Sequence, residues 1–463
     1  MKNNAFLKTF LFLCLPIVLQ NVISLGVNLA DNMMLGRYAE SSLSGVTAIN
    51  QIQFFYQCML GGIGDGCIIF GAQFWGRKDI DSIKKVSSIA MRCGLVIMIV
   101  LFIAVSAFPA QIIGLFTPDA EIIAEGMKYL NIIRFTYPFF CITQMLLVML
   151  RSVETVKIAF YLSVSTLVIN CGINYVLIFG NFGAPRMGVE GAAIGTLTAR
   201  IIEFIIILVF VFRIDTKIRI RLRDFLYFDR VMFKGYLKVA IPTFAAAAMW
   251  GANTAIQTAI LGNLSKSALA ANSMASNLFM IVKTMAQGSA AATNVIIGKT
   301  IGEGDLKKVR QYTKYLQIIF VFIGIISAVI LFALTEPVLS LYSFSDESRS
   351  YARSFLHILY VVILGMSYQM PTNFGIIKGG GDTKYALTVD VIGIWCLVIP
   401  LSFIAAFVFH ASPNTVVWCL NLDQLFKCIP AYIKCNHGHW IFTMTASGRS
   451  EKALALKDIR DGQ

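Results

Sequence analysis

The residues of this 463-residue chain that could carry chemistry are polar side chains inside long apolar stretches. Asp31 is one of them, and Asn28 lies three residues before it, on the same face of a helix. Asn170 and Asn174 are four residues apart and also share a helix face, and Thr196 lies in the next apolar stretch. Together these groups predict an oxygen-rich site with one negative charge. Such a site could hold Na⁺, because hard cations prefer oxygen ligands, or Asp31 could carry a proton.

A structural interpretation of Asp31 is a carboxylate that bonds neighbouring Asn side chains and helps the helices associate. A charged group at the centre of a membrane helix costs about 2.5–3.5 kcal/mol on insertion scales and is rarely kept without a use. This cost favours ion coupling over a packing role.

Three further charged residues within apolar stretches, Asp65, Asp390 and Lys283, are secondary candidates. Asp65 lies among four glycines whose spacing predicts close helix packing. Asp390 would face a cleft or pair near the end of its segment, and Lys283 would either face a cleft or pair with another segment. Arg200 and Glu203 are one turn apart, so we expect them to form an ion pair.

Aromatic, Met and Gln side chains in the apolar stretches are candidates for lining a substrate cavity, because such surfaces adapt to varied ligands. The alternative for each of them is simple packing. The candidates are Gln53, Tyr137, Trp250, Gln257 and Met274.

Motifs for catalysis or nucleotide binding are not found. HExxH and GxSxG do not occur, and Gly298-Lys299-Thr300 has Thr293 where a phosphate-binding loop needs Gly. The sequence therefore predicts no enzyme, no cofactor and no metal site beyond the Na⁺ alternative at Asp31. Transport driven by an ion gradient would need none of these.

The composition predicts the elements that position these residues. Hydrophobic residues make up 57% of the chain and charged residues only 14%, whereas a soluble protein carries about 25% charge. This excludes a soluble enzyme, a disordered protein and a secreted disulfide scaffold, and predicts an all-α integral membrane protein. A helix needs about 20 apolar residues to cross a bilayer. Twelve such stretches are present, near 10–35, 46–73, 88–114, 130–152, 158–180, 187–212, 236–261, 270–298, 315–342, 354–377, 385–409 and 413–433.

The net charge of +14 is concentrated in the connections that follow even-numbered spans, above all in residues 213–238. The positive-inside rule then predicts a multi-pass protein of the plasma membrane with both termini in the cytoplasm. We interpret the basic run as an orientation signal that attracts anionic lipids, and not as a nucleic-acid site.

The two halves of the sequence match at a shift of about 226 residues. Pro16 corresponds to Pro242, and the Gly-x-x-Asp motif that begins at Gly76 corresponds to the one at Gly302. At the same shift Asp31 becomes Gln257, so the fold does not require the acid. Six spans separate matched points, which predicts two parallel six-helix bundles related by a pseudo-twofold axis, an architecture typical of transporters. The expected parts are an N-lobe (1–212), a basic linker (213–235), a C-lobe (236–434) and a cytoplasmic tail (435–463).

Several motifs resemble the multidrug and toxin extrusion (MATE) family. They are Pro16 with Asn28-Leu-Ala-Asp31, Gly76-Arg-Lys-Asp79, the segment Gly188–Thr196, the segment Lys378–Thr383 and the ending Leu420–Pro430. The resemblance spans about residues 5–440 and implies cation-driven export of varied, often cationic and aromatic, compounds by alternating access of two lobes.

The resemblance is to the bacterial and archaeal branch related to the DNA-damage-inducible type. It implies that Asp31 is the central protonation or cation site, with Asn170 and Thr196 around it. Asn174 departs from that branch, where Asp is frequent. Residues 236–260 and the tenth span contain no Asp or Glu, so the C-lobe cation site of the other branch is not expected.

The sequence thus predicts a monomeric antiporter that exports organic cations or drugs in exchange for H⁺ or Na⁺, with membrane lipids as its surroundings. The alternative is a flippase for a lipid-linked precursor from the same superfamily. A flippase needs several basic residues inside its cleft to hold pyrophosphate, and here Arg200 and Lys283 are the main candidates.

Overall fold

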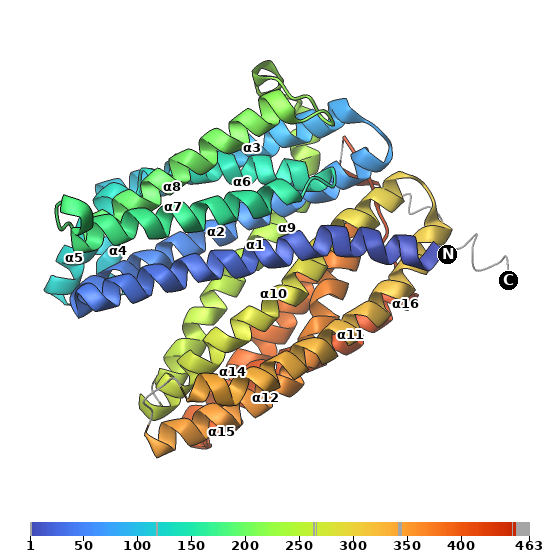
Figure 1. The fold of residues 1–463 in the computed structure, drawn as a ribbon. Helices are drawn as coiled ribbons and strands as arrows, with labels where there is room; N and C mark the ends of the chain where they lie inside the picture. The colour runs from blue at the N-terminus through green and yellow to red at the C-terminus, as the bar shows by residue number, and fades with distance from the viewer. Residues whose placement is uncertain are drawn as a thin grey trace. The chain divides into compact units, whose positions relative to one another are not determined.

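The computed structural model describes residues 2–116, 119–262, 264, 266–340, 345–446 and 448–450. Nearly all of them are helical (Figure 1). The first half contains α1 (Lys2–Tyr38), α2 (Glu40–Gly76), α3 (Ile80–Ala107), α4 (Pro109–Gly114), α5 (Ala120–Ile133), α6 (Thr136–Ser152), α7 (Lys157–Phe179), η1 (Asn181–Gly183), α8 (Val189–Val209) and η2 (Phe210–Ile214). The linker contains η3 (Leu222–Phe225).

The second half contains α9 (Arg230–Gly262), α10 (Lys266–Gly302), α11 (Leu306–Leu339), α12 (Asp346–Met370), η4 (Pro371–Ile377), α13 (Thr383–Asp390), η5 (Val391–Val398), α14 (Ile399–Phe403), η6 (Ile404–Val408), α15 (Pro413–Phe426) and α16 (Cys428–His437). Two short strands, β1 (Thr443–Thr445) and β2 (Gly448–Ser450), pair antiparallel at the C-terminal end. The all-α fold predicted from the composition is confirmed.

Each of the twelve predicted spans lies on one of these helices or on a run of consecutive ones. Within the described residues, eight helical segments are long and apolar enough to cross a membrane, or nine if the bent pair α5 and α6 is one span. Helices α9 and α10 and the pair α15–α16 are not among them. The multi-pass membrane character is therefore established, and the full count of twelve stays a prediction.

The internal repeat recurs in the helix boundaries. Helices α2 and α10 have the same length of 37 residues. Helices α3 and α11 begin after the matched residues Asp79 and Asp305, whose side chains accept hydrogen bonds from Ser82 N and Lys308 N at 3.0 and 2.9 Å. Even the left-handed residue of this turn is shared, with φ of 61° at Lys78 and 80° at Gly304. The sequence duplication is thus a structural duplication.

The chain forms two compact units. One contains Leu19–Gly71 and Asp79–Phe244, and the other contains Met1–Val18, Ala72–Lys78 and Ala245–Gln463. Residues 1–18 and 72–78 thus belong to the unit that holds most of the second half, whereas residues 236–244 belong to the other unit; the predicted lobe boundaries stay a prediction. Helices α1, α2 and α9 each contribute residues to both units.

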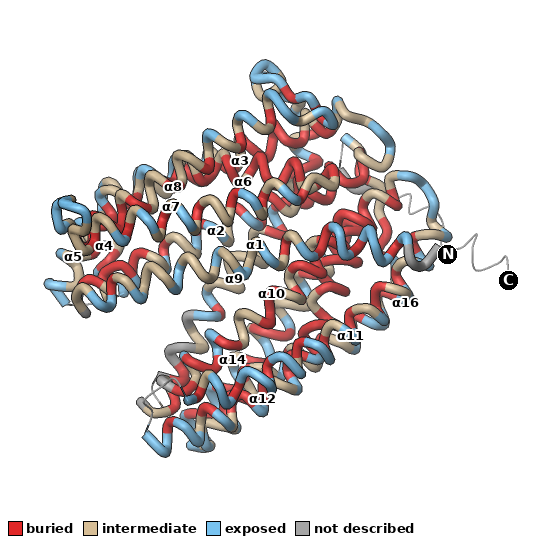
Figure 2. Tube along the Cα trace, in the orientation of Figure 1, coloured by how far each residue is buried: buried red, intermediate tan, exposed pale blue. Residues whose placement is uncertain are grey.

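Each unit has its own buried core (Figure 2). In the unit that holds the second half, α10 packs against α11 and α12, and α12 packs against α15. Met274, Phe355, Leu359 and Leu420 belong to the cluster at the centre of this packing. In the other unit α7 packs against α8, which also contacts α5 and α6.

Large apolar side chains also lie on the outside of the helices. On α3 and α11 they recur every three or four residues, so they form stripes along each helix, for example Val96, Val100 and Ile103 on α3 and Phe322, Val329 and Phe332 on α11. Soluble proteins rarely expose continuous apolar surface of this kind, whereas lipid tails cover it at no cost. These stripes fit the membrane-facing sides of the spans.

Candidate functional site

Asp31 lies beside α7, where it joins a chain of polar contacts. Asn174 Nδ2 donates to Asp31 Oδ1 at 2.7 Å and to Asn170 Oδ1 at 3.2 Å. Asn170 Nδ2 in turn donates to Thr196 Oγ1 on α8 at 3.1 Å. All four residues belong to one unit, and the predicted grouping of Asp31, Asn170, Asn174 and Thr196 is therefore present as a continuous hydrogen-bond chain.

This chain of contacts is withdrawn from solvent at its α7 end. Asn170 and Asn174 are only 1% and 0% exposed, because α7 packs closely against α8. Tyr129 on α5, a residue that the sequence did not point to, lies near Thr196 and Asp31. Burial strengthens each of these polar contacts, since there is little water to screen them.

Asn28, which we expected beside Asp31, does not join the chain of contacts. Its side chain is exposed on α1, and the contacts described for Asp31 run to α7 instead. The three-residue spacing places Asn28 and Asp31 on neighbouring turns of α1. Asp31 contacts α7, whereas the Asn28 side chain is exposed. The role of Asn28 as a ligand therefore stays a prediction.

Gly195 on α8 lets Asn174 approach, and it is a residue that the sequence analysis missed. A Cβ at this position would overlap Asn174 Oδ1. That oxygen is buried and has no hydrogen-bond partner in the described part of the chain. The available signal was the spacing of small residues in Gly191-Ala-Ala-Ile-Gly195, which is typical of close helix packing.

Substitution of Gly195 by Ala should displace Asn174 and break its hydrogen bond to Asp31. A misplacement of about 1 Å at a functional group can cost roughly a hundredfold in rate, so we expect gradient-driven efflux to fall by about tenfold or more. The matched control is Gly172→Ala on α7, because a Cβ there meets nothing within 4 Å. Efflux assays on both variants, with expression checked, test this; equal activity of the two would contradict the role of Gly195.

Arg200 and Glu203 form the predicted ion pair on α8. Arg200 Nη1 lies 2.6 Å from a Glu203 carboxylate oxygen, and the guanidinium also lies over the ring of Phe140 at 4.8 Å. The Glu203 side chain is only 6% exposed. The pair neutralises two charges inside the apolar unit, which confirms the pairing expected from their spacing.

Asp65 on α2 lies near Arg151 on α6, so it too has an opposite charge in its surroundings. The glycines around it permit close packing: a Cβ at Gly62 would lie 2.7 Å from Phe244 Cα, and one at Gly64 would lie 2.8 Å from a Val148 methyl group. The packing role expected for these glycines is confirmed. A function for Asp65 stays a prediction.

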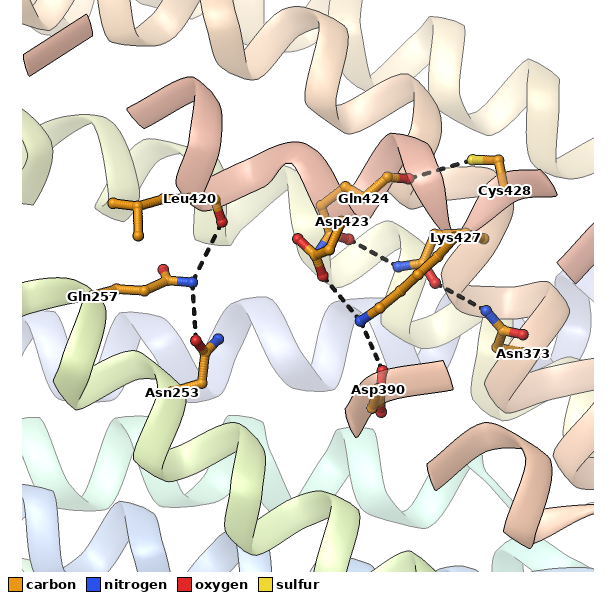
Figure 3. A network of polar contacts seen from close by, with 10 residues as sticks. Asn253, Gln257, Asn373, Asp390, Leu420, Asp423, Gln424, Lys427 and Cys428 are labelled. Atoms are coloured by element: carbon orange, nitrogen blue, oxygen red, sulfur yellow. Dashed lines mark hydrogen bonds and ion pairs between the residues drawn. The ribbon is translucent and has the colours of Figure 1, made fainter. Parts of the chain in front are cut away.

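Asp390 in the second half pairs with Lys427 on α15–α16, and the neighbouring Asp423 takes part (Figure 3). Lys427 Nζ lies 2.8 Å from Asp390 Oδ1 and 2.9 Å from Asp423 Oδ2. The Lys427 side chain is 3% exposed. Of the two alternatives for Asp390, pairing is therefore the one observed, and the charges that interrupt the last apolar stretch compensate each other.

The counterpart of Asp31 in the repeat, Gln257, is held by neutral contacts. Its Nε2 donates to Asn253 Oδ1 at 3.3 Å and to the Leu420 carbonyl at 3.5 Å (Figure 3). Lys283 on α10 lies over the ring of Trp250 on α9 at 4.5 Å. Lys283 and Trp250, which the sequence predicted as separate candidates, are therefore in contact with each other.

Two of the residues expected to line a substrate cavity are packed inside their units instead. Tyr137 is 0% exposed and lies against the ring of Tyr56, and Met274 is 2% exposed in the core of the second half. Aromatic and Met side chains fill cores as readily as they line cavities, so residue type alone does not distinguish the two roles. Gln53, Trp250 and Gln257 are partly exposed and stay candidates.

Within the described residues, no group of three or more His, Cys, Asp or Glu side chains is placed to hold a metal ion. The site around Asp31 supplies one carboxylate, two amides and a hydroxyl. Those oxygens suit a proton or a weakly held monovalent cation better than a tightly bound divalent metal.

A membrane protein made of two repeated helical halves, with an acid at Asp31 where the second half has Gln257, belongs to the class of transporters. The family model named MatE matches the chain twice, over residues 16–176 and 242–404, and the chain belongs to this family of transporters. The two matches begin at Pro16 and Pro242, the pair that marked the repeat in the sequence.

Curated relatives agree with this assignment. The chain is 26% identical over 411 residues to "Probable multidrug resistance protein NorM" of Photorhabdus laumondii, which covers 86% of this chain and 88% of the relative. It is 22% identical over 410 residues to "Uncharacterized transporter YisQ" of Bacillus subtilis, with 86% and 87% covered. One relative is thus named as a transporter and the other as a multidrug resistance protein.

Solved structures share the fold. One titled "Crystal structure of MATE in complex with MaL6" matches with a TM-score of 0.84 at 18% identity, covering 92% of this chain and 95% of the other. Another, "Outward-facing conformation of a multidrug resistance MATE family transporter of the MOP superfamily", matches with a TM-score of 0.83 at 19% identity, covering 92% and 94%. At these identities the likeness concerns the fold alone.

Proposed function

We propose that this chain is a secondary active antiporter that exports organic cations and other xenobiotics in exchange for H⁺ or Na⁺, with Asp31 as the residue that binds the coupling ion. The single observation that carries the proposal is the hydrogen-bond chain from Asp31 through Asn174 and Asn170 to Thr196. No cofactor takes part.

The contacts of Asp31 support a carboxylate that changes its occupant. Its described partner is the neutral amide of Asn174 at 2.7 Å, whereas Asp390 is neutralised by a bonded ammonium group at 2.8 Å. A carboxylate with an amide partner leaves room for a proton or a cation in one state of the cycle. Release of that ion would then weaken or strengthen substrate binding, which is the requirement for exchange.

The internal repeat also supports a role for Asp31 in binding the coupling ion. Gln257 occupies the position of Asp31 in the second half and is satisfied by an amide and a carbonyl. The fold therefore accommodates a neutral side chain at this position, so the acid in the first half answers a functional need. An acid without a function would be costly in an apolar bundle.

The substrate class rests on the relatives. Several bear the name "Probable multidrug resistance protein", which supports small-molecule drugs as substrates. The sequence-based expectations of a monomer in the plasma membrane, surrounded by lipid and with both termini in the cytoplasm, are carried into the proposal. The likeness to the DNA-damage-inducible branch also belongs to it.

The flippase alternative is not favoured by the comparisons. A flippase for a lipid-linked precursor would use basic side chains to hold pyrophosphate, yet Arg200 is bonded to Glu203 and Lys283 lies over Trp250. Phospholipid-analogue translocation in vesicles provides the direct comparison, and we expect none above the rate of protein-free vesicles.

The proposal is tested with purified protein in vesicles loaded with an ethidium-type dye, under a pH gradient and a sodium gradient imposed separately. One of the two gradients should drive dye movement against its concentration gradient, and collapse of that gradient should stop it. Dye movement that depends on neither gradient would overturn the proposed antiport.

A further inference from the structure

The segment that follows α16 folds back onto the protein instead of leading away from it. Trp440, Ile441 and Met444 are 3%, 7% and 0% exposed. The Trp440 indole Nε1 donates to the Cys435 carbonyl at 2.8 Å, which turns the chain at the end of α16. We expected residues 435–463 to form a tail, but this first part of the segment, residues 440–445, is docked; we refer to it as the strap.

One side of the strap lies against the connection between η4 and α13. Phe442 N donates to the Gly380 carbonyl at 2.8 Å, and Ile441 forms an antiparallel bridge with Gly381. A Cβ at Gly380 would overlap the Trp440 ring, so glycine is needed there. Just before the strap, Lys434 on α16 binds Asp382 at 2.9 Å.

The other side of the strap is held by the last turns of α2. The Gln73 side chain is fully buried; its Nε2 donates to the Phe442 carbonyl at 2.9 Å and its Oε1 accepts from Met444 N at 2.8 Å. Arg77 Nη1 donates to the Met444 carbonyl at 3.0 Å. The side chains of Gln73 and Arg77 thus hydrogen-bond backbone N–H and C=O groups of the strap, as a neighbouring β-strand would.

The last turns of α2 also cross the last turns of α10. A Cβ at Gly76 would overlap the Lys299 carbonyl, and a Cβ at Gly302 would overlap the Gln73 carbonyl. Gly76 and Gly302 are the matched residues of the repeat, so the crossing is symmetric. Residues 72–78 accordingly belong to the unit of the second half, although the rest of α2 belongs to the other unit.

The first half ends in a comparable segment, which bonds within its own half. Lys217 Nζ donates to the Val153 carbonyl at 2.7 Å, and Ile218 and Ile220 are 1% and 3% exposed. Lys217 and Thr443 are separated by the 226-residue shift of the repeat. The second copy differs in that it binds residues from α2, which is a helix of the first half.

We propose that the strap fixes the last turns of α2 to the second half of the chain, so that residues 72–78 move with that half during transport. The attachment itself is independent of the proposed function, and only its effect on transport rests on it. Loss of the strap would remove the bonds that Gln73 and Arg77 make to it and would leave the crossing with α10 in place.

The test is amide hydrogen exchange on the full-length protein in lipid nanodiscs. Trp440→Ala removes the anchor on the side of the strap away from α2, and should raise exchange about tenfold both in residues 440–445 and in residues 72–78. Gln73→Ala should do the same in residues 440–445. The control is Gln311→Ala, an exposed residue whose side chain bonds only a neighbouring turn through Tyr315; it should change neither region.

The outcomes separate the attachment from its consequence. Exchange that stays slow in residues 72–78 of Trp440→Ala, while residues 440–445 exchange faster, would overturn the attachment of α2. Wild-type dye efflux in a variant with fast exchange in both regions would overturn the role in transport. A wild-type protein that moves no dye would refute the proposed function, and exchange would still decide whether the strap holds α2.

Discussion

Asp31→Asn should abolish gradient-driven export while leaving the protein folded. The amide keeps the size of the side chain and retains an acceptor for Asn174 Nδ2, which donates to Asp31 Oδ1 at 2.7 Å. It removes the negative charge and the ability to bind and release a proton. Without a coupling ion to exchange, the ion gradient can no longer drive export of the substrate.

The measurement is dye efflux from vesicles under whichever gradient drives the wild-type protein. We expect Asp31→Asn to match vesicles without protein, with a melting temperature near that of the wild type. Asp65→Asn is the comparison variant, because Asp65 is a carboxylate on another helix of the same unit and is not one of the residues in the hydrogen-bond chain from Asp31 to Thr196; it should retain part of the activity. Full gradient-dependent efflux by Asp31→Asn would refute the role of Asp31.

Lys427→Met should destabilise the protein more than any other single change considered for the second half. Lys427 is the shared partner of Asp390 and Asp423, at 2.8 and 2.9 Å, and its side chain is 3% exposed. Its removal leaves the two neighbouring carboxylates without the cation that bonds both of them. Removing one member of a buried ion pair typically costs about 3–5 kcal/mol.

Thermal unfolding in detergent measures this effect, and a neutral triple variant isolates its cause. Lys427→Met combined with Asp390→Asn and Asp423→Asn removes all three charges, and replacement of a whole buried ion pair is often neutral. We therefore expect the triple variant to recover most of the lost stability. Lys308→Met is the control, because its pair with Glu303 is partly exposed and such pairs contribute about 0–1 kcal/mol. A single Lys427 variant as stable as the control would contradict this assignment.

Local spacing predicted the contacts within one helix. The three-residue spacing of Arg200 and Glu203 and the four-residue spacing of Asn170 and Asn174 fix which side chains face each other, because an α-helix repeats every 3.6 residues. The grouping of Asp31 with α7 and α8 came from the polar residue types and the family resemblance, and the structure brought the same residues together. Hydrophobic periodicity and the 226-residue shift gave the helices and the repeat.

Contacts between distant helices could not be predicted in the same way. The Asp390–Lys427 pair joins residues 37 positions apart, and only the packing of η5 against α15 brings them close. Spacing also did not decide the contacts of Asn28, whose side chain is exposed on α1; its role as a ligand stays a prediction. The spacing of Gly191 and Gly195 is typical of close helix packing, but it does not reveal that Asn174 is the residue that approaches Gly195. The strap was missed because composition and spacing do not reveal its contacts with α2.

The most direct test of Asp31 as the coupling site is to count the ions released when substrate binds. Purified wild-type protein in weakly buffered detergent solution should release about one H⁺, or one Na⁺, per chain on addition of a transported dye, as expected when one carboxylate exchanges its occupant. Asp31→Asn should bind the dye and release none. Equal release by the two proteins would contradict the account.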